Sequence, residues 1–153
     1  MLNVGEAAPD FTIQDQQGQP VTLSSLRGKT VVLFFYPKAD TPGCTTEACS
    51  FRDAKSDYDG ADTVLLGISP DPVIAQFKFA AKFDLPMQLL ADVDHAAIDA
   101  YGVWVEKSMY GKKYMGVDRT TFVIQPDGTI GHIFHKVKVQ DHAAEVLRAI
   151  KAA

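Results

Sequence analysis

The sequence predicts an α/β fold with a mixed central sheet flanked by helices. Two apolar runs, at residues 30–36 and 62–69, are rich in β-branched residues, which is the pattern of strands buried on both faces. A helix-like segment separates them, so strand, helix and strand are expected to form a right-handed parallel βαβ unit. Later, residues 119–137 contain two apolar runs joined at Pro126-Asp127-Gly128, which is typical of an antiparallel hairpin. One sheet with both parallel and antiparallel strands accommodates both patterns.

The N-terminal region predicts a β-hairpin added to this sheet. Residues 11–23 (FTIQDQQGQPVTL) contain two short strand-like runs around Gln17-Gly18, which favours a turn. The next residues, 24–29 (SSLRGK), fit a single helical turn. The first buried strand follows directly.

A helix is predicted after that strand. Thr41 suits its N-cap, Pro42 suits its first position, and Gly60 is expected beyond its end. After the second buried strand, Asp71 and Pro72 open an amphipathic helix that is expected over residues 71–84.

The second half continues the alternation of strands and helices. A short strand is expected at residues 87–92, a helical segment at 95–103, the antiparallel hairpin at 119–137 and a final helix at 140–153. The apolar stripe of the final helix is expected to consist of Ala144, Val146, Leu147 and Ile150. This order of elements, preceded by an extra hairpin, is that of a thioredoxin-like fold.

Composition favours one globular domain over residues 1–153. The 153 residues are 46% hydrophobic and 22% charged, enough for a sizeable core. Lys and Arg are scattered along a chain of formal net charge −4, so nucleic acid and membrane surfaces are not expected partners. The N-terminal residues lack a basic and apolar leader, and the longest apolar run, 31–36, is too short for a bilayer. A cytoplasmic protein is expected.

The chain contains two cysteines, Cys44 and Cys49. With Thr41 as N-cap, Cys44 lies in the first helical turn, where unpaired N–H groups and the helix dipole favour a thiolate. A buried, unreactive cysteine would also fit this position. Because a reducing compartment disfavours static disulfides, the pair is interpreted as catalytic, metal-binding or simply buried.

The spacing of the two cysteines sets a geometric condition. Five residues of helix rotate by ~140° and rise ~7.5 Å, so the two Cα atoms should lie ~8.6 Å apart. A disulfide requires less than ~7 Å between them. If the helix runs unbroken through both residues, they can bond only after part of it unwinds.

A metal site is not expected. Zinc sites generally need four ligands, and a second close pair of ligands is missing from the sequence. His132 and His135 are three residues apart on an expected strand, so their side chains should point to opposite faces. His95 and His142 are expected at the surface, at the starts of helices.

Three stretches carry a family resemblance: residues 37–53 (PKADTPGCTTEACSFRD), 5–15 (GEAAPDFTIQD) and 109–124 (MYGKKYMGVDRTTFVI). They resemble the peroxiredoxin Q or bacterioferritin comigratory protein group of peroxiredoxins. The family motif Pro-x-x-x-Thr-x-x-Cys is met by Pro37, Thr41 and Cys44. The resemblance covers nearly the whole chain and implies the peroxiredoxin type of thioredoxin-like fold.

The resemblance implies a thiol peroxidase without cofactor or metal. Cys44 would attack hydrogen peroxide or an organic hydroperoxide and become a sulfenic acid, which Cys49 would convert to an intramolecular disulfide. Thioredoxin or a similar dithiol protein would reduce that disulfide. A second family variant has its resolving cysteine in a later helix, but residues 71–84 contain none. Because resolution within one chain needs no partner subunit, a monomer is expected.

The resemblance also assigns roles to other residues. Arg119 would pair with the Cys44 thiolate, and Pro37 would shield the pocket. Thr41 would hydrogen bond the peroxide as well as cap the helix, which one hydroxyl can do by donating and accepting. Glu47, one turn beyond Cys44, should mildly oppose its ionisation unless Arg119 or another cation offsets it. In an expected loop, Val105 replaces the glycine of many relatives.

Two other functions compete with the peroxidase. A copper-delivering protein of thioredoxin fold would need Cys-x-x-x-Cys and an accessible histidine, but the spacer here has four residues. A thiol-disulfide oxidoreductase acting on proteins would be expected to carry Cys-x-x-Cys, which is also missing. Metal titration and insulin reduction would test these alternatives.

Overall fold

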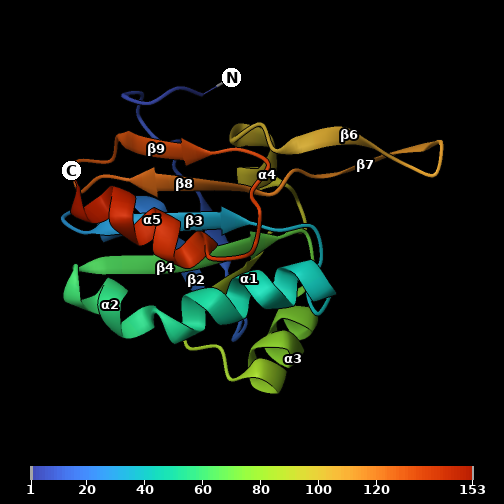
Figure 1. The fold of residues 1–153 in the computed structure, drawn as a ribbon, viewed down its shortest axis with the longest axis horizontal. Helices are drawn as coiled ribbons and strands as arrows, with labels where there is room; N and C mark the ends of the chain where they lie inside the picture. The colour runs from blue at the N-terminus through green and yellow to red at the C-terminus, as the bar shows by residue number, and fades with distance from the viewer. Residues whose placement is uncertain (1, 153) are drawn as a thin grey trace.

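A computed structural model describes residues 2–152 and places a five-stranded mixed sheet at the centre of the molecule (Figure 1). The strand order is β5-β4-β3-β8-β9. The strands are β3 (Thr30–Phe35), β4 (Thr63–Ser69), β5 (Gln88–Ala91), β8 (Thr120–Ile124) and β9 (Ile130–Phe134). β3, β4 and β5 run parallel, whereas β8 is antiparallel to both β3 and β9. The predicted mixed sheet is confirmed.

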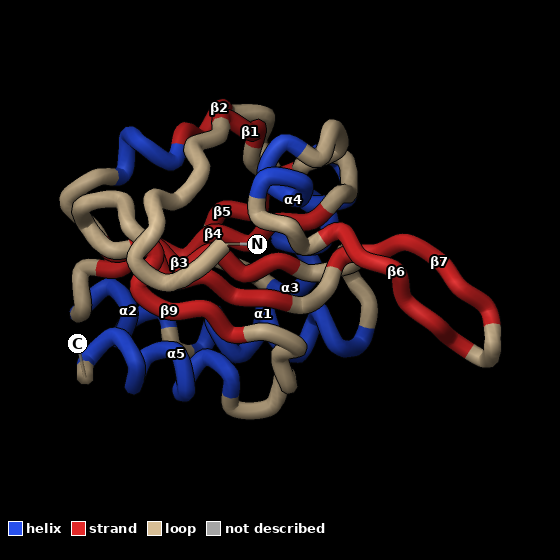
Figure 2. The backbone as a smooth tube through the Cα atoms, turned by 90° about the horizontal axis from the view of Figure 1, so that it is seen from above, coloured by secondary structure: helices blue, strands red, loops and turns tan. Residues whose placement is uncertain are grey.

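The two faces of the sheet are covered by different elements (Figure 2). Side chains of β3 alternate, with Val31, Leu33 and Phe35 in one apolar cluster and Val32 and Phe34 in the other. The first cluster includes residues of the predicted hairpin, β1 (Thr12–Gln14) and β2 (Pro20–Thr22), of η1 (Leu23–Leu26) and of α4 (Ala96–Ala100). The second includes residues of α1 (Pro42–Asp53), α2 (Lys55–Gly60), α3 (Val73–Phe83) and α5 (His142–Lys151).

The predicted helix after β3 is in fact two helices. α1 ends at Asp53, α2 begins at Lys55, and Gly60 is the last residue of α2 rather than lying beyond the helix. In α2, Tyr58 is completely buried, and its hydroxyl donates to the Ala143 carbonyl of α5 at 2.5 Å. The break at Ala54 thus accompanies a tertiary contact that the sequence pattern does not show. The helix expected over residues 71–84 is slightly shorter in the structure, where α3 begins at Val73 and ends at Phe83.

Besides the two predicted hairpins, the structure contains a third that the sequence pattern does not predict. It consists of β6 (Trp104–Met109) and β7 (Lys112–Val117), which pair only with each other. Val105 therefore lies in a strand and not in a loop. Most side chains of β6 and β7 are exposed or half-buried, so apolar alternation is absent. The turn between the strands has positive φ at both Tyr110 (51°) and Gly111 (78°).

The start of α5 also differs from expectation. Ala144 is exposed, and Ala143 takes its place in the buried stripe with Val146. His142, expected at the surface, is only 1% exposed because its ring packs against Phe51 and its Nε2 lies 2.8 Å from Thr121 Oγ1. His95 is partly covered by the ring of Trp104, at a centroid distance of 4.5 Å. Within residues 2–152, every helix is too short or too polar to cross a bilayer.

Candidate active site

Cys44 lies at the amino end of α1, beside the carboxyl end of β3. The chain leaves β3 at Phe35, crosses the loop at residues 36–41 and enters α1 at Pro42, so Cys44 is the third helical residue. Thr41 has the extended backbone of an N-cap, with φ −102° and ψ 156°. The predicted position of Cys44 in the first turn is confirmed. Free N–H groups at this end of a helix favour a negative charge.

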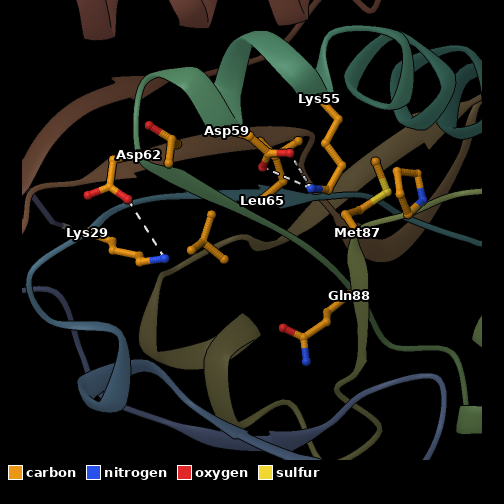
Figure 3. A pocket seen from close by; sticks show the side chains of 10 residues that line it. Lys29, Lys55, Asp59, Asp62, Leu65, Met87 and Gln88 are labelled. Carbon is orange, nitrogen blue, oxygen red and sulfur yellow. Dashed lines mark hydrogen bonds and ion pairs between the residues drawn. The ribbon is translucent and has the colours of Figure 1, made fainter.

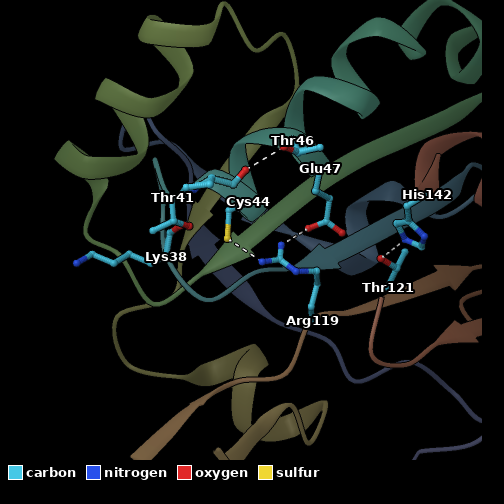
Figure 4. A network of polar contacts seen from close by, with 9 residues as sticks. Lys38, Thr41, Cys44, Thr46, Glu47, Arg119, Thr121 and His142 are labelled. Carbon is cyan, nitrogen blue, oxygen red and sulfur yellow. Dashed lines mark hydrogen bonds and ion pairs between the residues drawn. The ribbon is translucent and has the colours of Figure 1, made fainter. Parts of the chain in front are cut away.

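Arg119 contacts Cys44 directly (Figure 4). Its Nη2 donates to the Cys44 Sγ at 3.3 Å, and its side chain is only 18% exposed. The Arg119 backbone is fixed immediately before β8, because its carbonyl accepts a hydrogen bond from the Val137 N–H at 2.9 Å. Gly43 leaves room for this guanidinium, since a Cβ there would lie 3.1 Å from Nη2. The sequence thus brings a cation and a thiol together from opposite halves of the chain.

Glu47 completes a buried row of three groups. Its Oε1 accepts from Arg119 Nη1 at 3.0 Å, its side chain is 1% exposed, and its Oε2 has no hydrogen-bond partner among the described residues. Burial raises the pKa of Glu47 to about 7, although the Arg119 cation acts in the opposite direction. Arg119 is therefore the cation that offsets the negative charge of Glu47 near Cys44. In the sequence Glu47 is only a charge near Cys44, because its burial depends on contacts that form in the fold.

The loop before α1 is held by polar contacts. The Thr41 hydroxyl donates to the Lys38 carbonyl at 2.8 Å and makes no capping bond to the helix. The Ala39 N–H donates to Asp71 Oδ2 at 2.7 Å, and Asp40 pairs with Lys82 of α3 at 2.9 Å. Thr41 is therefore an N-cap by backbone conformation alone. Its single hydroxyl hydrogen is already used, so its oxygen can only accept further hydrogen bonds.

The loop also rests on a buried polar network. The Tyr36 hydroxyl donates to Gln76 Oε1 at 2.5 Å, and Gln76 Nε2 donates to Ser69 Oγ at 2.9 Å. Ser69 Oγ in turn donates to Asp71 Oδ2 at 2.7 Å, the same atom that holds the loop. Such satisfied buried networks fix one geometry. Pro37 lies half-buried in this loop, directly after Tyr36.

Cys49 lies on the same helix, and both thiols are free. α1 is continuous from Pro42 to Asp53, which confirms the unbroken helix on which the spacing argument depends. Cys44 is buried, whereas Cys49 is half-buried. The far half of α1 is firmly packed, because Phe51 stacks on Phe34 with ring centroids 4.6 Å apart. The amino-terminal turn lacks such an aromatic anchor, so it is the part best suited to unwind.

Other polar groups do not build a competing centre in the described part of the chain. Within residues 2–152, His, Cys, Asp and Glu side chains form no group of three that could hold a metal ion. A pocket at the amino ends of β3 and β4 contains several charges (Figure 3). Those charges pair with one another, Lys29 with Asp62 at 3.8 Å and Lys55 with Asp59 at 2.9 Å. The pocket lies at the opposite ends of the parallel strands from Cys44.

Comparisons with known proteins identify the family. Residues 4–133 match the AhpC/TSA family. The chain is 49% identical to the putative peroxiredoxin bcp of Coxiella burnetii over 95% of this chain and 97% of that protein. It is 45% identical to peroxiredoxin Bcp of Bacillus subtilis, with 98% and 96% covered. The chain belongs to the Bcp peroxiredoxins of the AhpC/TSA family.

Solved structures of peroxiredoxins agree with this identification. A cysteine-to-serine mutant of Xylella fastidiosa PrxQ superposes with a TM-score of 0.95 at 33% identity, covering 99% of this chain and 97% of that one. The bacterioferritin comigratory protein of Xanthomonas campestris, described for its alkyl peroxide reduction activity, gives 0.91 at 38% identity with 99% and 97% covered. The peroxiredoxin type of thioredoxin-like fold is confirmed. Bcp peroxiredoxins as a group are thiol peroxidases.

Replacing Glu47 with glutamine should change how stability depends on pH. The pKa of Glu47 is raised from 4.5 to about 7 in the fold, so the folded state holds a proton that the unfolded state releases between these values. Stability from this proton is fully present below the ordinary pKa and is lost as the pH rises through about 7. In Glu47→Gln this loss, on the order of 3 kcal/mol, should disappear.

Urea unfolding of the reduced protein at several pH values measures this effect. Wild type should lose stability relative to Glu47→Gln between about pH 5 and about pH 8. Glu6→Gln provides a matched control, because Glu6 is an exposed carboxylate. Parallel pH profiles for wild type and Glu47→Gln would show that the buried carboxyl group does not titrate in this range.

Proposed function

We propose that this peroxiredoxin reduces hydrogen peroxide and organic hydroperoxides with Cys44 as the attacking thiolate. The observation that carries the proposal is the contact of Arg119 Nη2 with Cys44 Sγ at 3.3 Å in the first turn of α1. The guanidinium and the helix end both stabilise a negative sulfur, and the thiolate is the reactive form of cysteine. The same guanidinium has further N–H groups that can donate to a peroxide oxygen.

The first step transfers one oxygen. The Cys44 thiolate attacks the nearer peroxide oxygen, the O–O bond breaks, and an S–O bond forms. The leaving oxygen takes a proton and departs as water or an alcohol, and Cys44 becomes a sulfenic acid. Thr41 would accept a hydrogen bond from the peroxide O–H, because its own hydrogen is donated to the Lys38 carbonyl. Pro37 would shield the pocket from the loop above it.

The second step forms a disulfide between Cys44 and Cys49. The Cys49 sulfur attacks the sulfenic acid sulfur, and the hydroxyl group leaves as water. In a continuous helix the two Cα atoms lie ~8.6 Å apart, which exceeds the reach of a disulfide. The turns of α1 before Phe51 must therefore open, while the Phe51 packing holds the rest of the helix. A dithiol protein such as thioredoxin would then reduce the disulfide.

We further propose that residues 1–153 form one domain and act as a cytoplasmic monomer. The two apolar clusters lie on opposite faces of the same central sheet. Removing the elements of either cluster would therefore expose one face of that sheet. Resolution within one helix makes a second subunit chemically unnecessary.

Intact mass after one equivalent of peroxide tests the proposed chemistry. Wild type should lose two hydrogens, because Cys44 and Cys49 form a disulfide. Cys49→Ser should instead gain one oxygen, because its sulfenic acid has no resolving thiol, and should overoxidise with further peroxide. If wild type instead gains one oxygen and stops at the sulfenic acid as Cys49→Ser does, Cys49 is not the resolving residue.

A further inference from the structure

Most of the exposed large apolar side chains of the described residues lie on two elements, the β6–β7 hairpin and α3. Four of them lie on the β6–β7 hairpin, two lie on α3, and Val93 directly follows the end of β5 and Asp92. The hairpin side chains are Met109, Tyr110, Tyr114 and Met115, and those of α3 are Ile74 and Phe77. The remaining exposed large apolar residue of the described chain is Val4, in the N-terminal segment. Single exposed apolar residues are ordinary, but a concentration beside a reactive group indicates a binding surface.

The hairpin and α3 flank the site from two sides. β7 ends at Val117, two residues before Arg119, so the base of the hairpin adjoins the guanidinium that contacts Cys44. α3 is tied to the loop before α1 by the ion pair of Lys82 with Asp40. Figures 1 and 2 both show the hairpin projecting beyond the body, and Figure 1 shows it on the side where α1 begins.

The hairpin is also positively charged, in contrast with the chain as a whole. It carries Lys107, Lys112 and Lys113 against a single carboxylate, Glu106, whereas the whole chain has a formal net charge of −4. The Tyr110 side chain at its tip is 98% exposed. An aromatic tip on a basic stem fits a partner whose surface is apolar with an acidic rim.

We propose that the β6–β7 hairpin is the docking element for an acidic dithiol protein that reduces the Cys44–Cys49 disulfide. This inference rests on the proposed function. A peroxide is too small to need such a surface, whereas a reductant protein must be held while sulfur atoms exchange. A second copy of this chain is a poor occupant, because a symmetric contact would place two basic hairpins against each other.

The docked reaction is a thiol-disulfide exchange. One thiolate of the partner attacks a sulfur of the Cys44–Cys49 disulfide, forming a mixed disulfide and releasing the other cysteine as a thiolate. The second partner thiol attacks the mixed disulfide and releases the remaining cysteine. Two electrons and two protons pass from the partner dithiol to this chain, and the partner is left as a disulfide.

Two hairpin variants test the proposal. Tyr110→Asn removes the aromatic ring but suits the backbone, because asparagine tolerates the positive φ of 51° and Asn-Gly favours this hairpin turn. Lys112→Glu reverses one exposed charge on the stem. Val4→Ser is the control, since Val4 is also an exposed apolar residue but lies next to Gly5, whose N–H donates to the Ile130 carbonyl, away from the site.

The measurement is the reduction rate of the preformed disulfide by reduced bacterial thioredoxin and, separately, by dithiothreitol. Each hairpin variant should lower the thioredoxin rate about tenfold, since aromatic and charged anchors dominate such contacts. The rate with dithiothreitol and the rate of the first peroxide turnover should stay unchanged. The difference in thioredoxin rate between wild type and the hairpin variants should shrink as salt increases.

Several outcomes would overturn the docking role. One is an unchanged thioredoxin rate in both variants, and another is an equal loss in Val4→Ser. A dimer in wild type that becomes monomeric in Tyr110→Asn would assign the surface to a second copy instead. Failure of the proposed function itself is distinguishable, because then peroxide would not form the disulfide in any of these proteins.

Discussion

Replacing Cys44 with serine should abolish peroxide turnover, with a loss on the order of 10⁴-fold or more. The serine hydroxyl is nearly isosteric with the thiol, and it can still accept the hydrogen bond that Arg119 Nη2 makes to Sγ at 3.3 Å. It does not ionise near neutral pH, however, and oxygen cannot form the reversible sulfenic acid. The variant should therefore keep the fold and the arginine contact while losing the reaction.

Peroxide consumption with thioredoxin and its reductase is the appropriate assay for Cys44→Ser. Cys49→Ser is the matched control, because it changes the other cysteine of the same helix and should retain the first, stoichiometric turnover. Thermal unfolding of both variants should lie close to that of reduced wild type. Turnover that persists in Cys44→Ser would reject Cys44 as the attacking residue.

Much of the fold could be predicted because its central strands are buried on both faces. Burial on two sides requires continuous apolar runs such as residues 30–36, and such runs are visible without knowing their neighbours. The β6–β7 hairpin lacks this signal, since its strands pair only with each other and most of its side chains are exposed or half-buried. Its turn is made by Tyr110 and Gly111 with positive φ, and a tyrosine there gives no warning of a turn.

The active site could be predicted only in part, for a related reason. The position of Cys44 follows from local rules, because the N-cap and Pro42 fix where the helix begins. The contact between Arg119 and Cys44 joins residues far apart in the chain, and only the family resemblance indicated it. The burial of Glu47 and His142 depends on packing between α1, β8 and α5. From hydrophobic periodicity alone, both residues would be expected at the surface.

Replacing Arg119 with lysine should slow the reaction of Cys44 with peroxide about a hundredfold. Arg119 donates through Nη2 to Cys44 and through Nη1 to Glu47 at the same time. A lysine ammonium retains the charge but is a single point, so it cannot hold both partners in this geometry and orient a peroxide as well. The rate constant should be measured in a single turnover with limiting peroxide, so that reduction of the disulfide does not contribute.

A purely structural role of Arg119 can be separated from its role in the reaction. Arg119→Lys also weakens the contact to buried Glu47, which lowers stability because a buried carboxylate then lacks its partner. Adding Glu47→Gln removes that penalty, so the double variant should regain stability but should remain slow with peroxide. Arg148→Lys, on the exposed face of α5, is the control for the change of residue type. A double variant that recovers the wild-type rate would mean that Arg119 acts only by holding Glu47.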